Sequence, residues 1–122
     1  MRLGVLAVVI GVGVGCSDQG YMSDLQDPSP DKRMAAAAFL GAQRDQDAVG
    51  GLIDVLDDSD AGVRAKSAWA LGMIRSREAV GPLVSRLTDP DRAVKQAVVG
   101  ALMNIEEPEA LPALRQALSS ES

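Results

Sequence analysis

Apolar residues recur along this chain with the period of an α-helix. In the middle of the chain, Val63, Ser67, Ala70, Leu71 and Ile74 follow one another at i, i+4, i+7, i+8 and i+11. These positions form one stripe on a helix with 3.6 residues per turn. A shorter aliphatic stripe follows after a polar turn. No segment alternates apolar and polar residues over the length of a strand, so we expect pairs of helices and no strands.

The two-helix pattern recurs at one fixed spacing along the chain, which we call the repeat period. Residues 27–57, 58–88 and 89–118 align without a gap, and leucines superpose at Leu40, Leu71 and Leu102, at Leu52, Leu83 and Leu114, and at Leu56, Leu87 and Leu118. Self-similarity at such a fixed period indicates a repeat array. Because neither helix can bury its stripe alone, the units must stack. The sequence therefore predicts an all-α fold, a short right-handed α-solenoid of three two-helix repeats.

Two aspartates mark the predicted starts of the long helices. Asp60 and Asp91 stand three residues before Val63 and Val94, where a side-chain oxygen can accept from the free amides of the first turn. The first repeat carries the weakest copy of the stripe. Residues 119–122 remain as a C-terminal tail.

Composition narrows the chemistry that the chain can perform. It has no histidine, a single cysteine and a formal net charge of −5. Metal sites built from histidine and cysteine are therefore excluded, as are Cys/His and Ser/His/Asp catalysis. An acidic chain without a basic stripe is also a poor match for phosphate backbones. We expect no enzyme activity, no cofactor, no metal and no nucleic-acid partner.

The N-terminus carries a short apolar run from Leu3 to Gly15. As a helix, this run spans about 20 Å, less than the roughly 30 Å hydrocarbon core of a bilayer. A positive charge before a short apolar segment is typical of a secretory signal. The following Val14-Gly15-Cys16 resembles the end of a bacterial lipobox, although Gly13 stands where that motif prefers an aliphatic residue.

The lipobox resemblance implies that residues 1–15 are a signal peptide and that Cys16 is the lipid attachment site. Residues 16–26 would be the lipidated N-terminus and a tether, and the protein would lie in the cell envelope, at the outer membrane facing the periplasm. Membrane contact would be through the lipid anchor only. An uncleaved hydrophobic tail or a misassigned start is the alternative, with a cytoplasmic location. Tyr21 and Leu25 also precede Leu52 and Leu56 by one repeat period, so a worn-down earlier repeat is a second interpretation of the tether.

The middle repeat carries the most specific motif, Asp58…Val63-Arg64-x-x-Ser67-Ala68-x-Ala70-Leu71-Gly72-x-Ile74…Glu78-Ala79-Val80-x-Pro82-Leu83-x-x-x-Leu87. It resembles a HEAT repeat of the short, phycobilisome-lyase-like type, over residues 27–118. The resemblance implies a ladder between repeats, formed by an acid and the basic residue six places later. The matching pairs are Asp27 with Arg33, Asp58 with Arg64, and Asp89 with Lys95. Lysine is a point charge and cannot make the two-pronged contact of arginine.

The same resemblance implies a scaffold that contacts protein partners through a concave face lined by the second helices. With the leucines turned inward, Asp54, Ser85 and Gln116 form an outward row, and Arg86 and Arg115 flank it. The exposed glycines of these helices would let a partner's backbone approach closely. An accessory lyase-like or chaperone-like subunit and a structural envelope lipoprotein are the alternative functions.

Trp69 lies about 120° from the apolar stripe of its helix, at the place held by Ala38 and Gly100 in the other repeats. Two placements are compatible with this position. The indole can be an exposed contact point, or it can lie flat over Ala65 and Met73.

Overall fold

The computed structural model describes residues 20–105 and Arg115. Each repeat begins with a long helix, namely α3 (Pro30–Ala42), α5 (Ala61–Ile74) and α7 (Arg92–Ile105). The short second helices of the first two repeats are α4 (Val49–Asp54) and α6 (Val80–Ser85). They are flanked by the 3₁₀ turns η2 (Gln46–Ala48), η3 (Val55–Asp57), η4 (Arg77–Ala79) and η5 (Arg86–Thr88). No strand occurs among the described residues, so the all-α prediction is confirmed.

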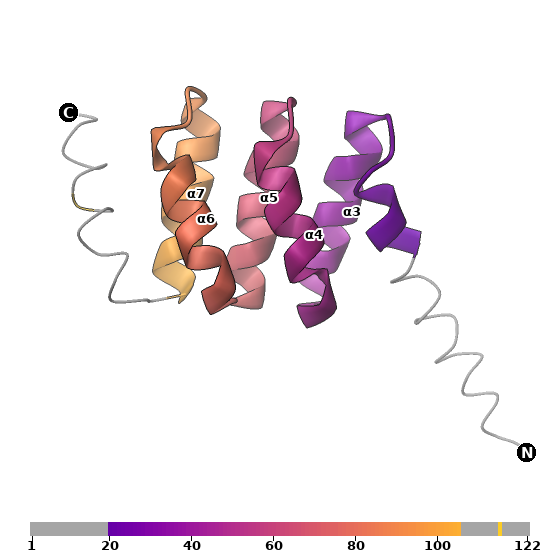
Figure 1. Ribbon diagram of the computed structural model, residues 1–122, viewed down its shortest axis with the longest axis horizontal. Coiled ribbons are helices and arrows are strands. Elements are labelled where there is room, and N and C mark those ends of the chain that lie inside the picture. Colours follow the sequence, from indigo (N-terminus) through magenta and orange to yellow (C-terminus); the bar gives the residue numbers. More distant parts are fainter. Residues whose placement is uncertain (1–19, 106–114, 116–122) are drawn as a thin grey trace, which may run out of the picture.

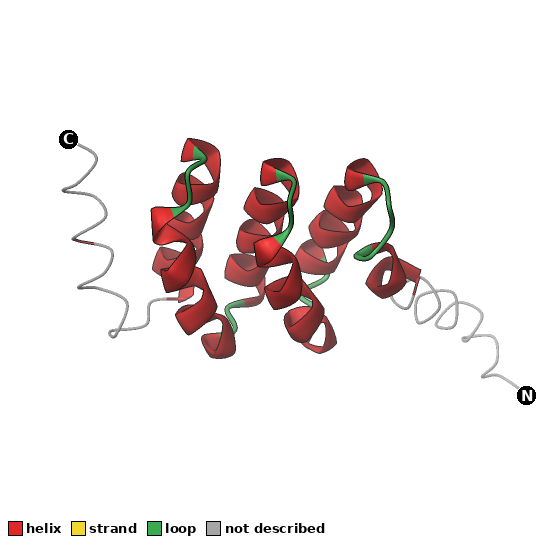
Figure 2. Cartoon of the chain, turned by 45° about the horizontal axis from the view of Figure 1, so that its top comes forward, coloured by secondary structure: helices red, strands yellow, loops and turns green. Residues whose placement is uncertain are grey.

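The helices form a short two-layer array. Helix α5 packs between α3 and α7, and the second helices α4 and α6 form the other layer (Figure 1). The turns between first and second helices lie along one edge of the array, which we call the turn edge (residues 43–45 and 75–76). The connections that lead into each first helix lie along the opposite edge, the ladder edge (residues 27–29, 58–60 and 89–91; Figure 2).

The first helices bury the stripe that the sequence predicts. All five stripe residues of α5 are buried, and in α7 so are Val94, Val98, Ala101 and Leu102. The predicted capping residues are also confirmed. The carboxylates of Asp60 and Asp91 each accept, at 3.1 Å, from the amide three residues later. The first turns of α5 and α7 are thereby fixed by side chains of the ladder edge.

Two glycines let neighbouring first helices approach closely. A Cβ atom at Gly41 would lie 2.6 Å from the Cα of Ala70, and one at Gly72 would lie 2.7 Å from the Cα of Ala101. Such contacts are shorter than any side chain tolerates, so glycine is required at both positions. The same place in α7 holds Met103, which is 61% exposed. Among the described helices, these close contacts therefore join α3 to α5 and α5 to α7.

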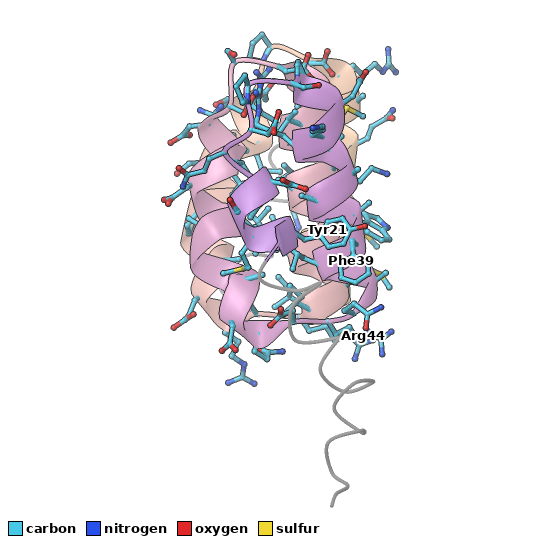
Figure 3. All side chains as sticks on the ribbon, turned by 90° about the vertical axis from the view of Figure 1, so that its right-hand side faces the viewer. Tyr21, Phe39 and Arg44 are labelled. Atoms are coloured by element: carbon cyan, nitrogen blue, oxygen red, sulfur yellow. The ribbon has the colours of Figure 1, made fainter. Side chains whose placement is uncertain are left out.

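The segment before α3 is packed against the first repeat. Residues 20–24 are helical, Leu25 is 2% exposed, and the ring of Tyr21 stacks on that of Phe39 with centroids 4.0 Å apart (Figure 3). The tether predicted to reach residue 26 is therefore corrected, because residues 20–25 belong to the folded array. The apolar and aromatic side chains of this segment pack on the surface of the first repeat.

Several expectations fall outside the described residues. They are the signal peptide, the lipid attachment at Cys16, most of the second helix of the third repeat, and the tail at 119–122. Within the described part of the chain, no helix has both the length and the apolar character needed to cross a bilayer.

Candidate functional site

The ladder edge is built around Arg64, near the start of α5. Its Nε donates to Oδ2 of Asp89 at 2.9 Å, and its Nη2 donates to Oδ1 at 3.1 Å. Its Nη1 donates to the carbonyl oxygen of Asp58 at 2.8 Å. The side chain of Arg64 is 12% exposed and that of Asp89 is fully buried. This is a two-pronged, charge-assisted contact between the second and third repeats.

Arg33 makes the corresponding contact between the first and second repeats. Its Nη2 donates to Oδ1 of Asp58 at 3.0 Å, and its Nη1 donates to the carbonyl oxygen of Asp27 at 2.7 Å. The Nε atom lies 2.8 Å from Oδ2 of Asp58, but its N–H does not point at that oxygen closely enough for a hydrogen bond. The first pair therefore has one side-chain hydrogen bond where the second has two.

The contacts specify which part of each acid the arginine uses. Arg33 and Arg64 touch the acid six places earlier only through its main-chain oxygen, and they pair with the carboxylate 25 places later. Lys95 is half-buried on α7. Asp27, Asp58 and Asp89 hold the same place in successive repeats, and the next such place in the sequence holds Ser120, which is not an acid.

Arg86, which the sequence places beside the docking face, lies instead in this ladder. Its Nη1 is 3.3 Å from Oδ2 of Asp89, and its Nη2 is 3.9 Å from Oδ1 of Asp57. Asp89 thus receives two arginines, and its Oδ1 also accepts from the amide of Asp91 at 2.8 Å. We therefore remove Arg86 from the candidate docking face. The spacing of three residues between Arg86 and Asp89 was the signal available in the sequence.

The two ladder carboxylates are held in their charged form. Burial alone would raise the pKa of Asp89, but the hydrogen bonds from Arg64 and the Asp91 amide, with the charges of Arg64 and Arg86, bring it below its ordinary value. The pKa of Asp58 is likewise lowered, because contacts from Arg33 and the Asp60 amide outweigh burial. The hydrogen bonds to Asp89 raise the pKa of Arg64. The ladder is thus fixed and internally neutralised.

The exposed surface of α4 and α6 forms a second candidate site, which we call the second-helix face. Gly50 and Gly81 are exposed there, and a Cβ atom at either would meet nothing within 4 Å. Asp54 and Ser85 are exposed at the ends of the two helices, and the Ser85 hydroxyl donates to the carbonyl oxygen of Gly81 at 3.3 Å. Ile53 and Val84 are half-buried on the same two helices. Arg115 is exposed and helical, and Gln116 lies outside the described residues.

Trp69 lies on the other layer. The indole is 37% exposed, and Nζ of Lys66 is 5.2 Å from its ring centroid. Its Cζ3 atom is 3.0 Å from the place where a Cβ of Gly41 would be. The ring is therefore partly exposed, as one of the two predicted placements expects, and it also reaches across the junction of α3 and α5.

The described residues contain no group of three or more histidine, cysteine, aspartate or glutamate side chains that could hold a metal ion. The arrangement offers structural ion pairs at one edge and an open helical surface on one face. This arrangement of helices is an α-solenoid built from stacked helical hairpins.

This chain belongs to the HEAT-repeat family. The family model for HEAT repeats matches residues 22–86 and 50–122. HEAT-repeat proteins are typically non-catalytic, and their repeats generally mediate protein–protein interaction. A comparison with curated proteins finds no match.

Proposed function

We propose that this protein is a small, non-catalytic adaptor that binds a protein partner on its second-helix face. Its repeats are of the short, phycobilisome-lyase-like type, as their short and gap-free period suggests. Lipid attached to Cys16 holds it in the cell envelope, facing the periplasm from the outer membrane.

The exposed glycines Gly50 and Gly81 carry the docking proposal. Glycine inside a helix is destabilising by roughly 0.5–1 kcal/mol relative to alanine. Gly41 and Gly72 offset this through close helix packing, but a Cβ atom at Gly50 or Gly81 would meet nothing within 4 Å. Neither glycine has a positive φ that would require it. The fold therefore has no use for these two glycines, whereas a partner's backbone could approach closely over both.

The surroundings of the glycines suit a polypeptide ligand. The half-buried Ile53 and Val84 offer apolar contact, and the exposed Asp54 and Ser85 offer an acceptor and a hydroxyl at the border. An apolar centre with a polar border is the usual composition of a protein interface. Because the glycines stand at the same place in neighbouring repeats, the partner would lie across both repeats.

The anchor is supported by the apolar run that stops at the chain's single cysteine. Intact mass of the protein extracted from membranes should show the loss of residues 1–15 and the addition of lipid. A soluble product that starts at Met1 would contradict the anchor and leave the docking proposal to be judged separately.

The docking proposal is tested by adding bulk at a glycine. In Gly81→Leu, a leucine side chain enters open space, so the melting temperature should stay equal or rise, while a partner captured by crosslinking in intact cells should be lost. Gly100→Leu is the matched control, since Gly100 is also exposed in a helix with open space around it, but on the first-helix layer. A partner that survives Gly81→Leu and is lost with Gly100→Leu would place docking on the other layer.

A further inference from the structure

Two arginines on the turn edge adopt a backbone conformation that favours glycine. Arg44 has φ +53° and Arg75 has φ +61°, and no other non-glycine residue among those described has a positive φ. The two positions are one repeat period apart, so the same unusual choice occurs in neighbouring repeats. Each follows the end of a first helix, where a left-handed residue is common and is usually glycine. Arginine at such a place is strained by its side chain.

The fold makes no use of the two guanidinium groups. Both side chains are exposed, and among the described residues neither has a hydrogen bond or an ion pair to another side chain or carbonyl. Arg33, Arg64 and Arg86, in contrast, are all engaged in the ladder. Strain that is kept without an internal contact points to a role outside the fold.

The two turns lie side by side. Nε2 of Gln46 donates to the carbonyl oxygen of Ile74 at 3.4 Å, which links the first turn to the end of α5. Arg44 stands two residues before Gln46 and Arg75 directly follows Ile74, so the two arginines share one edge. Asp45 on this edge is occupied as a cap for the amide of Asp47 at 2.9 Å, and Asp47 itself is exposed. Asp45 and Asp47 offset the positive charges of Arg44 and Arg75 on this edge. A ligand would therefore be recognised through contacts with the individual guanidinium groups.

The packed segment before α3 places this edge near the proposed lipid anchor. Because residues 20–25 belong to the folded array, only Ser17, Asp18 and Gln19 separate Cys16 from it. Four residue steps span at most roughly 14 Å. In the repeat register, residues 20–24 correspond to 51–55, and a second helix runs from the turn edge toward the ladder edge. The chain therefore enters from the side of the turn edge, where Arg44 lies below Tyr21 and Phe39 in Figure 3.

We propose that the turn edge lies against the bilayer surface, with the guanidinium groups of Arg44 and Arg75 donating to the phosphate oxygens of lipid headgroups. This inference rests on the anchor at Cys16 in the proposed function. Guanidinium matches phosphate geometry well, and a short tether supplies a high effective concentration, so two contacts can orient the domain without binding strongly alone. The second-helix face would then stay open to a partner beside the membrane.

The experiment supplies the anchor chemically. The chain from Cys16 to Ser122 retains every described residue, and its single cysteine can be coupled to a maleimide lipid in vesicles of phosphatidylcholine and phosphatidylglycerol. Hydrogen exchange should slow several-fold at residues 43–46 and 74–77 on coupling, and stay unchanged at 58–60 and 89–91. Inorganic phosphate added to the uncoupled chain should give no such protection. Protection of the ladder edge, equal protection of both edges, or protection by phosphate alone would overturn the proposal.

Variants separate this role from a purely structural one. Arg44→Gly/Arg75→Gly relieves the backbone strain, so its melting temperature should hold or rise, while the protection on vesicles should be lost. Arg92→Gln, at an exposed arginine next to the ladder edge, should retain it. If the arginines serve only the helix ends through the helix dipole, the glycine variant will melt lower and keep its protection, which would overturn the proposal. Since the anchor is supplied by coupling, failure here is distinct from a lack of acylation in cells.

Discussion

Removing Arg64 should destabilise the array more than removing Arg33. Arg64→Ala deletes two hydrogen bonds to the carboxylate of Asp89 and two to carbonyl oxygens, and it leaves that fully buried carboxylate with Arg86 at 3.3 Å and one amide. Breaking a buried pair by removing one partner costs about 3–5 kcal/mol, and we expect about 3 because of the remaining contacts. Arg33→Ala deletes one hydrogen bond to a carboxylate and two to carbonyl oxygens, and the Asp58 left behind is 10% exposed, so we expect about 1–2 kcal/mol.

Urea unfolding of the chain from Cys16 to Ser122, followed by both helicity and Trp69 fluorescence, measures these free energies. Coincident curves from the two signals are needed for a two-state analysis. The cycle with Asp89→Ala isolates the pair, and we expect a coupling of about 1–3 kcal/mol between Arg64 and Asp89. Arg92→Gln is the control and should change stability by less than about 0.5 kcal/mol. Equal losses for Arg33→Ala and Arg64→Ala would refute the argument from hydrogen-bond number and burial.

Further predictions concern pH, caps and helix contacts. Because the folded state lowers the pKa of Asp58 and Asp89, these two carboxylates stabilise the fold fully above their unfolded pKa of about 3.9, and this stabilisation is lost as the pH falls through their folded pKa. Melts at decreasing pH should show the loss, and Asp89→Asn should reduce it. Asp60→Ala should lower the free energy of unfolding by about 1 kcal/mol, whereas Ser29→Ala should leave it nearly unchanged, since Ser29 makes no cap bond. Gly72→Ala should destabilise the protein by about 1–3 kcal/mol through the contact with Ala101. Gly81→Ala is the control and should be neutral or stabilising. Equal melting temperatures of the two variants would contradict this prediction.

The fold can be predicted from the sequence because the same pattern of apolar and small residues recurs in every repeat. Leucines and small residues at equal spacing fix where each first helix buries its stripe, and Asp60 and Asp91 mark where α5 and α7 begin. The glycines of the second-helix face are also visible in the register. These features are local, or recur at one fixed distance, so they need no knowledge of the stacking.

Contacts between repeats are harder to predict. The ladder arginines pair with a carboxylate 25 residues later, a distance that follows only once the stacking is known. Arg86 has Val55 at its place in the first repeat, so the register gives no reason to assign it to the ladder. The stack of Tyr21 on Phe39 joins two segments that are well separated in sequence and has no counterpart elsewhere in the described chain, so the sequence alone does not decide between a tether and a worn-down earlier repeat.

The left-handed backbone conformation of Arg44 and Arg75 is a third feature that the sequence does not predict. Glycine after a helix is a recognisable stop signal, but arginine at the same place carries no sign of its backbone conformation. Only the dihedral angles of Arg44 and Arg75 reveal that two repeats make the same strained choice.

Site-specific photo-crosslinking in intact cells tests the central claim, that a protein partner docks on the second-helix face. A crosslinking residue placed at exposed Ser85 on α6 is compared with one at exposed Gln96 on α7. We predict a defined adduct from position 85 that disappears in Gly81→Leu, and none from position 96. An adduct from position 96 alone, or one from position 85 that persists in Gly81→Leu, would contradict docking on the second-helix face.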